Sequence, residues 1–192
     1  VSPETEETFE AVCFAVPMSV ASDAIETYGS LAERAVFDVT GTMAEPVAAM
    51  RKHAPNRERV SFHPLFAPDN EPGNVPVVAD ALGPATDRVR DTLSARGNSL
   101  FETTPEEHDE AMETVQARTH TAVLAYALAA ESVPEGFHTP ISGPLSDLAA
   151  QVTRGEARVY GDVQATFEGA DDVAAAAERV ADADESEFER LY

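Results

Sequence analysis

The sequence is short of basic residues and of cysteine, and each shortage excludes a class of protein. The chain has 192 residues, with 13 Lys and Arg against 35 Asp and Glu, and a formal net charge of −22. Because 13 cationic side chains cannot neutralise many phosphates, a nucleic-acid or anionic-membrane partner is disfavoured. The single cysteine, Cys13, excludes an internal disulfide and is typical of a reducing compartment.

Long apolar runs and phosphate-binding glycine motifs are also missing. No run approaches the 18 apolar residues of a membrane span, and the acidic N-terminus does not resemble a signal peptide, so we expect a cytoplasmic protein. Neither G-x-G-x-x-G nor G-x-x-x-x-G-K-[ST] occurs, and there is no C-x-x-C pair. The usual phosphate-binding turn of a nucleotide-binding sheet is therefore not in this sequence.

The acidic residues are spread along the whole chain, whose composition is otherwise typical of a folded protein. Hydrophobic residues make up 43% of it, enough for a core. Self-repulsion of this size needs screening by ions. We therefore expect a protein adapted to molar salt.

The first third of the chain alternates apolar runs with helical patterns. The pattern predicts strands over 9–16, 35–39 and 59–62, with helices over 19–31 and 42–53 between them. This β-α-β-α-β order is typical of a parallel sheet with helices packed on it. A further strand over 75–79 contains Pro76, which predicts an edge strand.

A helix over 84–96 and a strand over 100–103 complete this part, and the pattern then becomes purely helical. A long helix is expected over 106–132, followed by helices over 145–154, 157–167 and 171–191. We predict an α/β part over 1–103, an incomplete Rossmann-type parallel sheet, and an all-α part over 104–192.

His63 is the first candidate for chemistry. It follows the strand over 59–62 and begins a proline-bounded loop. A histidine at the end of a buried strand is well placed to act as a base, although many such residues are only surface side chains at a junction.

The other candidates are the adjacent pair His108 and Asp109, together with His120, Arg118, Arg154 and Arg158. His108 and His120 lie about 18 Å apart along one predicted helix, so they cannot share a metal ion, and we expect no metal site. His108 could equally be a side chain of the first helical turn, with Asp109 favoured there by the helix dipole, and His120 could be a hydrogen-bonded polar residue. Arg154 and Arg158 could be solvated charges or could grip a carboxylate.

Four segments together resemble one known family, the prephenate or arogenate dehydrogenases. The segment from His63 to Pro68, HPLFAP, resembles the family's H-P-M-F-G-P. The segment TPEEHD, with His120 beyond it, resembles an E-H-D…H helix. Cys13–Pro17 and Asp38–Thr40 resemble two strand ends beside the cofactor. The resemblance runs from the family's fourth nucleotide-binding strand to the C-terminus.

The resemblance implies an NAD- or NADP-dependent oxidative decarboxylation of prephenate or arogenate in tyrosine biosynthesis. His63 would draw the proton from the C4 hydroxyl of the substrate as hydride leaves. The resemblance also implies that His120, Arg154, Thr40 and His108 contact the substrate. It implies that Val16, Pro17 and Thr40 contact the cofactor. The helical part would form a homodimer, as family members do.

The sequence departs from the family pattern in three places. Gly41 and Met43 stand where the family often has Ser and Lys, and an ungapped alignment puts Gln151 rather than Arg154 at the arginine position. The glycine-rich first unit is not in this sequence. The alternatives are a catalytically inactive relative that binds a metabolite for regulation, and a related NAD(P)-linked dehydrogenase with another substrate.

Overall fold

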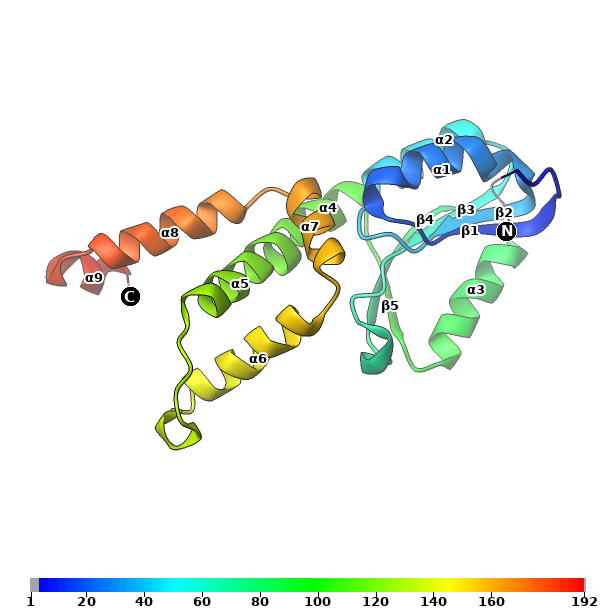
Figure 1. Ribbon diagram of the computed structural model, residues 1–192. Coiled ribbons are helices and arrows are strands. Elements are labelled where there is room, and N and C mark those ends of the chain that lie inside the picture. The colour runs from blue at the N-terminus through cyan, green and yellow to red at the C-terminus, as the bar shows by residue number, and fades with distance from the viewer. Residues whose placement is uncertain (1–3, 192) are drawn as a thin grey trace. The chain divides into compact units, whose positions relative to one another are not determined.

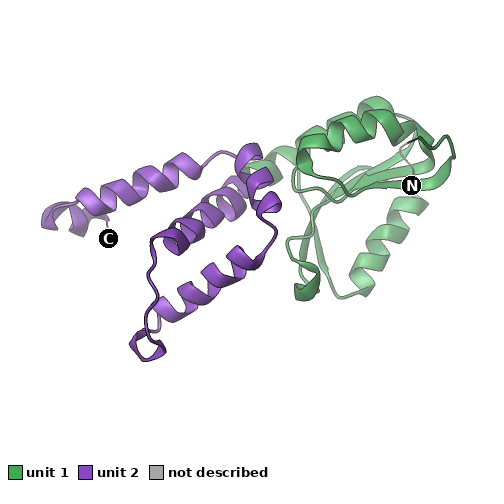
Figure 2. Ribbon diagram, viewed as in Figure 1, with its two compact units in different colours: residues 1–110 green, residues 111–192 purple. Residues whose placement is uncertain are grey.

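The computed structural model describes residues 4–191, and the chain divides into two compact units, residues 1–110 and 111–192 (Figure 2). The sequence placed a boundary before residue 104, whereas the structural division falls inside the helix α4 (Pro105–Met112). The beginning of α4 belongs to the first unit because His108 and Asp109 bond to residues of that unit. Across residues 4–191, no helix has the length and apolar character needed to cross a membrane.

The first unit is built on a five-stranded sheet in the order β1-β2-β3-β4-β5 (Figure 1). Its strands are β1 (Phe9–Phe14), β2 (Ala32–Asp38), β3 (Glu58–Phe62), β4 (Asn74–Ala81) and β5 (Ser99–Glu102). The first three strands are parallel, as the β-α-β-α-β pattern predicted. β4 runs antiparallel to β3, and β5 runs parallel to β4.

Helices cover both faces of this sheet, so the strands are apolar on both sides. Figure 1 shows α1 (Ala21–Tyr28) and α2 (Ala44–His53) on one face and α3 (Pro84–Ala95) on the other. The α1/α2 side buries one core, which includes Ile25, Val47 and Met50, and the α3 side buries another, which includes Val60, Phe62, Val75 and Val77. Two apolar layers hold the strand ends rigidly in register.

The prediction that Pro76 marks an edge strand is wrong. β4 lies inside the sheet, between β3 and β5. Proline is tolerated because its position lies just beyond the last paired residues of β3, Phe62 with Val77. There the carbonyl of Pro76 accepts a hydrogen bond from the backbone N–H of His63 at 3.2 Å. Pro76 therefore helps to hold the loop that carries His63.

The second unit is helical. It contains a π-helical stretch (Glu113–Arg118), α5 (Thr119–Ala129), α6 (Ser142–Arg154), α7 (Ala157–Thr166), α8 (Ala170–Asp182) and α9 (Glu185–Leu191), with a 3₁₀ turn (Glu135–Phe137). The single helix expected over 171–191 is in fact two helices. The chain leaves α8 at Ala183 in an extended conformation, and Asp184 then caps α9 by accepting from the N–H of Glu187.

Candidate functional site

The carboxyl ends of β1, β2 and β3 lie along one edge of the sheet. Phe14 is paired with Asp38, and Asp38 with Ser61, so these residues form one row across the three strands. Two positions beyond that row, the chain reaches Val16, Thr40 and His63. Ligands of open α/β sheets bind outside the carboxyl ends of parallel strands. Residues expected near the cofactor and the expected base are therefore on the same edge.

His63 is buried and bonded to a second histidine. Its side chain is joined through Nδ1 to Nε2 of His108 across 2.9 Å, and the two rings meet edge to face with centroids 5.1 Å apart. Only 7% of His63 and 3% of His108 is exposed. His63 is therefore not a surface side chain, and His108 is in direct contact with it.

Asp109 anchors this pair to the start of α2. Its Oδ1 lies 2.7 Å from Nδ1 of His108 and accepts from the N–H of Met43 at 2.9 Å. Its Oδ2 accepts from the N–H of Ala44 and from the hydroxyl of Thr42, each at 3.0 Å. The N-terminus of a helix favours a negative charge. The carboxylate is thus fixed at a helix start and holds His108 in turn.

The surroundings keep His63 neutral and Asp109 ionised. Burial, with a smaller contribution from the neighbouring His108, lowers the pKa of His63 to about 3, although Asp109 acts in the opposite sense. Burial alone would raise the pKa of Asp109, but the hydrogen bonds from His108, Met43, Ala44 and Thr42 lower it below its usual value. A neutral imidazole can accept a proton, and the nearby carboxylate would stabilise the charge that results.

Thr40 is buried at the same edge of the sheet. Its N–H and its hydroxyl donate to Oδ1 of Asp38 at 3.1 and 2.6 Å, and only 3% of the residue is exposed. Burial raises the pKa of Asp38 to about 6, against the effect of the bonds from Thr40. Thr40 therefore shapes this edge through Asp38, and its hydroxyl would donate to a ligand only by giving up that bond.

In the second unit, His120 lies in α5 beside a ring of α7. Its imidazole meets the ring of Tyr160 edge to face, with centroids 4.8 Å apart, and burial lowers its pKa. Nδ1 of His120 is buried, and none of the described residues gives it a hydrogen-bond partner. Tyr160 also lines a hollow of about 390 Å³ with Gln164 and Gly161. Tyr160 therefore contacts His120 and also forms part of the wall of this hollow.

Arg154 is the last residue of α6 and is exposed. Its Nε donates to the carbonyl of Ala150, one turn earlier, at 2.9 Å. That bond leads the side chain back along its own helix. Gln151, the alternative at this position of the pattern, is also exposed.

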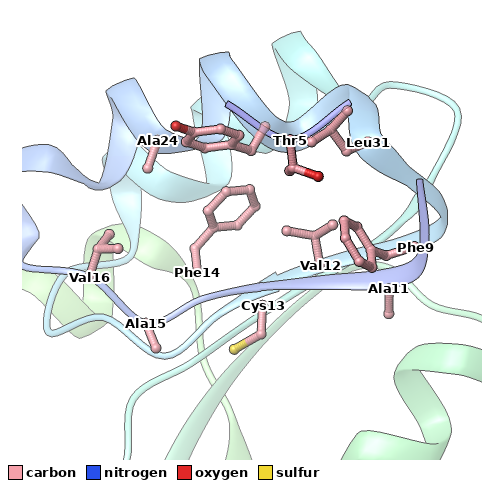
Figure 3. A pocket seen from close by; sticks show the side chains of 11 residues that line it. Thr5, Phe9, Ala11, Val12, Cys13, Phe14, Ala15, Val16, Ala24 and Leu31 are labelled. Carbon is pink, nitrogen blue, oxygen red and sulfur yellow. The ribbon is translucent and has the colours of Figure 1, made fainter. Parts of the chain in front are cut away.

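A second hollow, of about 430 Å³, lies between β1 and α1 (Figure 3). Figure 3 shows Val12 and Phe14 pointing towards the helix, whereas Ala11 and Cys13 point to the opposite face of the strand. The lining is apolar apart from a few groups such as Thr5. Within residues 4–191, β1 pairs with β2 alone, so this hollow lies at an edge of the sheet.

Comparison with known proteins supports the family suggested by the motifs. No protein-family model matches the chain. It is 32% identical over 171 residues to the 4-amino-4-deoxyprephenate dehydrogenase of Streptomyces pristinaespiralis, an alignment that includes 84% of this chain and 58% of that protein. The chain is a relative of the prephenate dehydrogenases.

Solved structures show the same fold. A prephenate dehydrogenase from Aquifex aeolicus, in complex with hydroxyphenyl propionate and NAD+, superposes with a TM-score of 0.66 at 17% identity over 95% of this chain and 73% of that one. The arogenate dehydrogenase of Synechocystis gives 0.57 at 16% identity over 91% of this chain and 69% of that one. The Rossmann-type sheet followed by helices is therefore the prephenate dehydrogenase fold.

Sequence reasoning did not find what Asp109 does in this relative of the prephenate dehydrogenases. It placed Asp109 near the start of its own helix, whereas the carboxylate binds the start of α2. One signal was available, because α2 begins at Ala44 after Met43 and has no cap from its own side chains among the described residues. An uncapped helix start needs an acceptor from elsewhere in the chain.

Among residues 4–191, no group of three or more His, Cys, Asp or Glu side chains is arranged to hold a metal. His63, His108 and Asp109 are instead arranged in series, each bonded to the next.

Proposed function

We propose that this chain carries the substrate side of an NAD(P)-dependent dehydrogenase that oxidises and decarboxylates prephenate or arogenate. The observation that carries the proposal is the buried, neutral His63 at the carboxyl ends of three parallel strands. The chain spans 58% of the length of the curated relative that it matches, so the activity is assigned to the protein of which this sequence forms at least part.

His63 would act as the proton acceptor of this reaction. It would draw the proton from the hydroxyl at C4 of the ring while hydride leaves the same carbon. NAD(P)+ supplies the hydride acceptor. The bond between the ring and its carboxylate then breaks, CO2 leaves, and the ring becomes aromatic. General bases of this kind contribute about 10²- to 10⁴-fold to a rate.

Val16, Pro17 and Thr40 would line the nicotinamide end of the cofactor site. They follow β1 and β2 at the edge that also carries His63, which is where such a ring must lie to receive hydride. The free side of β1 and the apolar hollow beside it suit pairing with a further strand of the nucleotide-binding sheet. That strand would belong to the unit that carries the phosphate-binding turn.

The second unit would supply the remaining substrate contacts and the dimer. We assign His120 and Arg154 to the substrate, His120 through its buried Nδ1 and Arg154 through a carboxylate. Leu128, Phe137 and Ile141 are 89%, 77% and 80% exposed, and exposed apolar side chains of this size suit association with a second copy. Its place in amino-acid biosynthesis would make the protein cytoplasmic.

A second candidate substrate is 4-amino-4-deoxyprephenate, because the curated relative is named for it. That molecule carries an amino group at C4 in place of the hydroxyl. A neutral imidazole can accept a proton from either group, so His63 is compatible with both substrates.

The test is turnover by the full-length protein with prephenate, arogenate and 4-amino-4-deoxyprephenate, followed as reduced cofactor and aromatic product. We expect activity with at least one of them. We expect His63→Asn to lower kcat about 10²- to 10⁴-fold while substrate binding stays measurable. His138→Asn, at an exposed position of the second unit, is the matched control and should leave both unchanged.

Two results would count against this proposal. Equal losses of binding and turnover in His63→Asn would argue against a proton-accepting role. Tight binding of one of these compounds with no turnover by the unmodified protein would favour the inactive, metabolite-binding alternative.

A further inference from the structure

We propose that Asp109 and His108 are positioning residues that hold His63 in a single tautomer, with hydrogen on Nδ1 and the lone pair on Nε2. This inference rests on the proposed function, because it names the nitrogen of His63 that takes the proton. It is carried by the two consecutive contacts, Asp109 to His108 and His108 to His63.

The direction of the series is set at Asp109. Each of its oxygens accepts from a backbone N–H group at the start of α2, which can only donate, and the hydroxyl of Thr42 donates to Oδ2 as well. An ionised carboxylate has only acceptors to offer. The bond of 2.7 Å to Nδ1 of His108 therefore requires a hydrogen on that nitrogen.

The second step applies to the neutral form of His108. When that ring carries a single hydrogen, on Nδ1, its Nε2 carries the lone pair and must accept. Its partner across 2.9 Å is Nδ1 of His63, which must then donate. Both rings are almost fully buried, so water does not compete for these positions. His63 is left with its lone pair on Nε2.

The consequence is that His63 already has the tautomer that can accept a proton at Nε2 before the substrate binds. In a serine protease triad a buried carboxylate holds a histidine in the same way, and replacing it by asparagine costs about 10⁴ in kcat through the wrong tautomer. Here the carboxylate acts through one additional imidazole. Proton uptake by His63 would also be stabilised along the series, towards Asp109.

The direct test is the tautomer of each histidine in the full-length protein, read from the ring nitrogen shifts of 15N-histidine at neutral pH. We expect both His63 and His108 to carry hydrogen on Nδ1. In Asp109→Asn, the amide can donate to Nδ1 of His108, which would reverse both rings. We expect kcat to fall about 10²- to 10⁴-fold with little change in KM.

Glu58→Gln is the matched control. Glu58 accepts from the N–H groups of Ala85 and Thr86 at 2.7 and 2.9 Å, so it caps α3 as Asp109 caps α2. Its loss should weaken a helix start in the same unit and leave both the histidine shifts and kcat unchanged. An equal loss of kcat in the two variants would overturn the positioning role.

The spectrum of the unmodified protein decides the matter even if Asp109→Asn does not fold. Hydrogen on Nε2 of His63 would overturn the inference. The same spectrum separates the two proposals, because a protein without dehydrogenase activity can still show both rings in the expected tautomer, and an active enzyme can show the opposite one.

Discussion

The two units of this chain treat polar and apolar groups in opposite ways. The first unit buries several carboxyl groups and gives them directional partners, as with Asp80, whose two oxygens accept from Arg51 and Arg59 at 2.6 Å. The second unit buries little, with a small core around Val123, Ala149 and Val152. It leaves large apolar side chains exposed instead.

This difference follows from their architectures. A sheet covered on both faces closes its own core and holds strand ends at fixed spacings, so polar groups can be placed there accurately. Alanine-rich helices offer shallow surfaces that become well buried only against another surface. The first unit therefore suits the accurate placement of polar side chains, whereas the second leaves apolar side chains exposed.

The largest effect that would sharpen this comparison is that of salt. With a net charge of −22, we expect the protein to unfold as salt falls well below about 1 M, where the screening length is about 3 Å. The second unit should lose protection first because its core is smaller. Hydrogen exchange measured by segment over a salt series tests the order. Equal protection of both units at all salt concentrations would contradict it.

A pair of phenylalanines tests the difference in packing directly. Phe62 is fully buried in the first unit, whereas Phe137 is 77% exposed in the second. We expect Phe62→Ala to lower the free energy of unfolding by about 3–5 kcal/mol, and Phe137→Ala by less than about 0.5 kcal/mol. Denaturant unfolding in molar salt, at a concentration that keeps the chain monomeric, measures both. Similar losses would show that the two units are packed alike.

A smaller effect should come from the buried carboxyl of Asp38. Its pKa is about 6 in the folded chain, against 3.8 for an ordinary Asp, so the folded state binds the extra proton between these values. Stability from this group is therefore present below about pH 4 and is lost as pH rises through 6. We expect the free energy of unfolding of Asp38→Asn, relative to that of the unmodified protein, to increase by about 3 kcal/mol between pH 4 and pH 7.

Asp80→Asn is the control for this pH effect. The pKa of Asp80 is lowered, because the hydrogen bonds and charges of Arg59 and Arg51 outweigh its burial. Its contribution is present above the unfolded pKa and is lost only as pH falls below it, so the difference from the unmodified protein should be constant between pH 5 and 7. Parallel stability curves for all three proteins would refute the role given to Asp38.

Much of the fold could be predicted because its signals are local. Apolar runs and helical spacing located the strands and helices of the first unit to within a few residues, and they located His63 at a strand end. The errors arose where tertiary context overrides a local rule. Pro76 occupies an inner strand because its missing N–H falls beyond the last pairing of β3. The helix expected over 171–191 is interrupted because Asp184 caps a new one.

The sequence by itself determined the type and order of the elements, the acidic surface and the family resemblance, since each depends on residues that are close together in the chain. The tertiary structure alone decided the connections of the site. His63 meets His108 across 45 positions, and Asp109 reaches Thr42 across 67. Such contacts depend on the register of parallel strands and on which helix start lies within reach, and no local pattern encodes either.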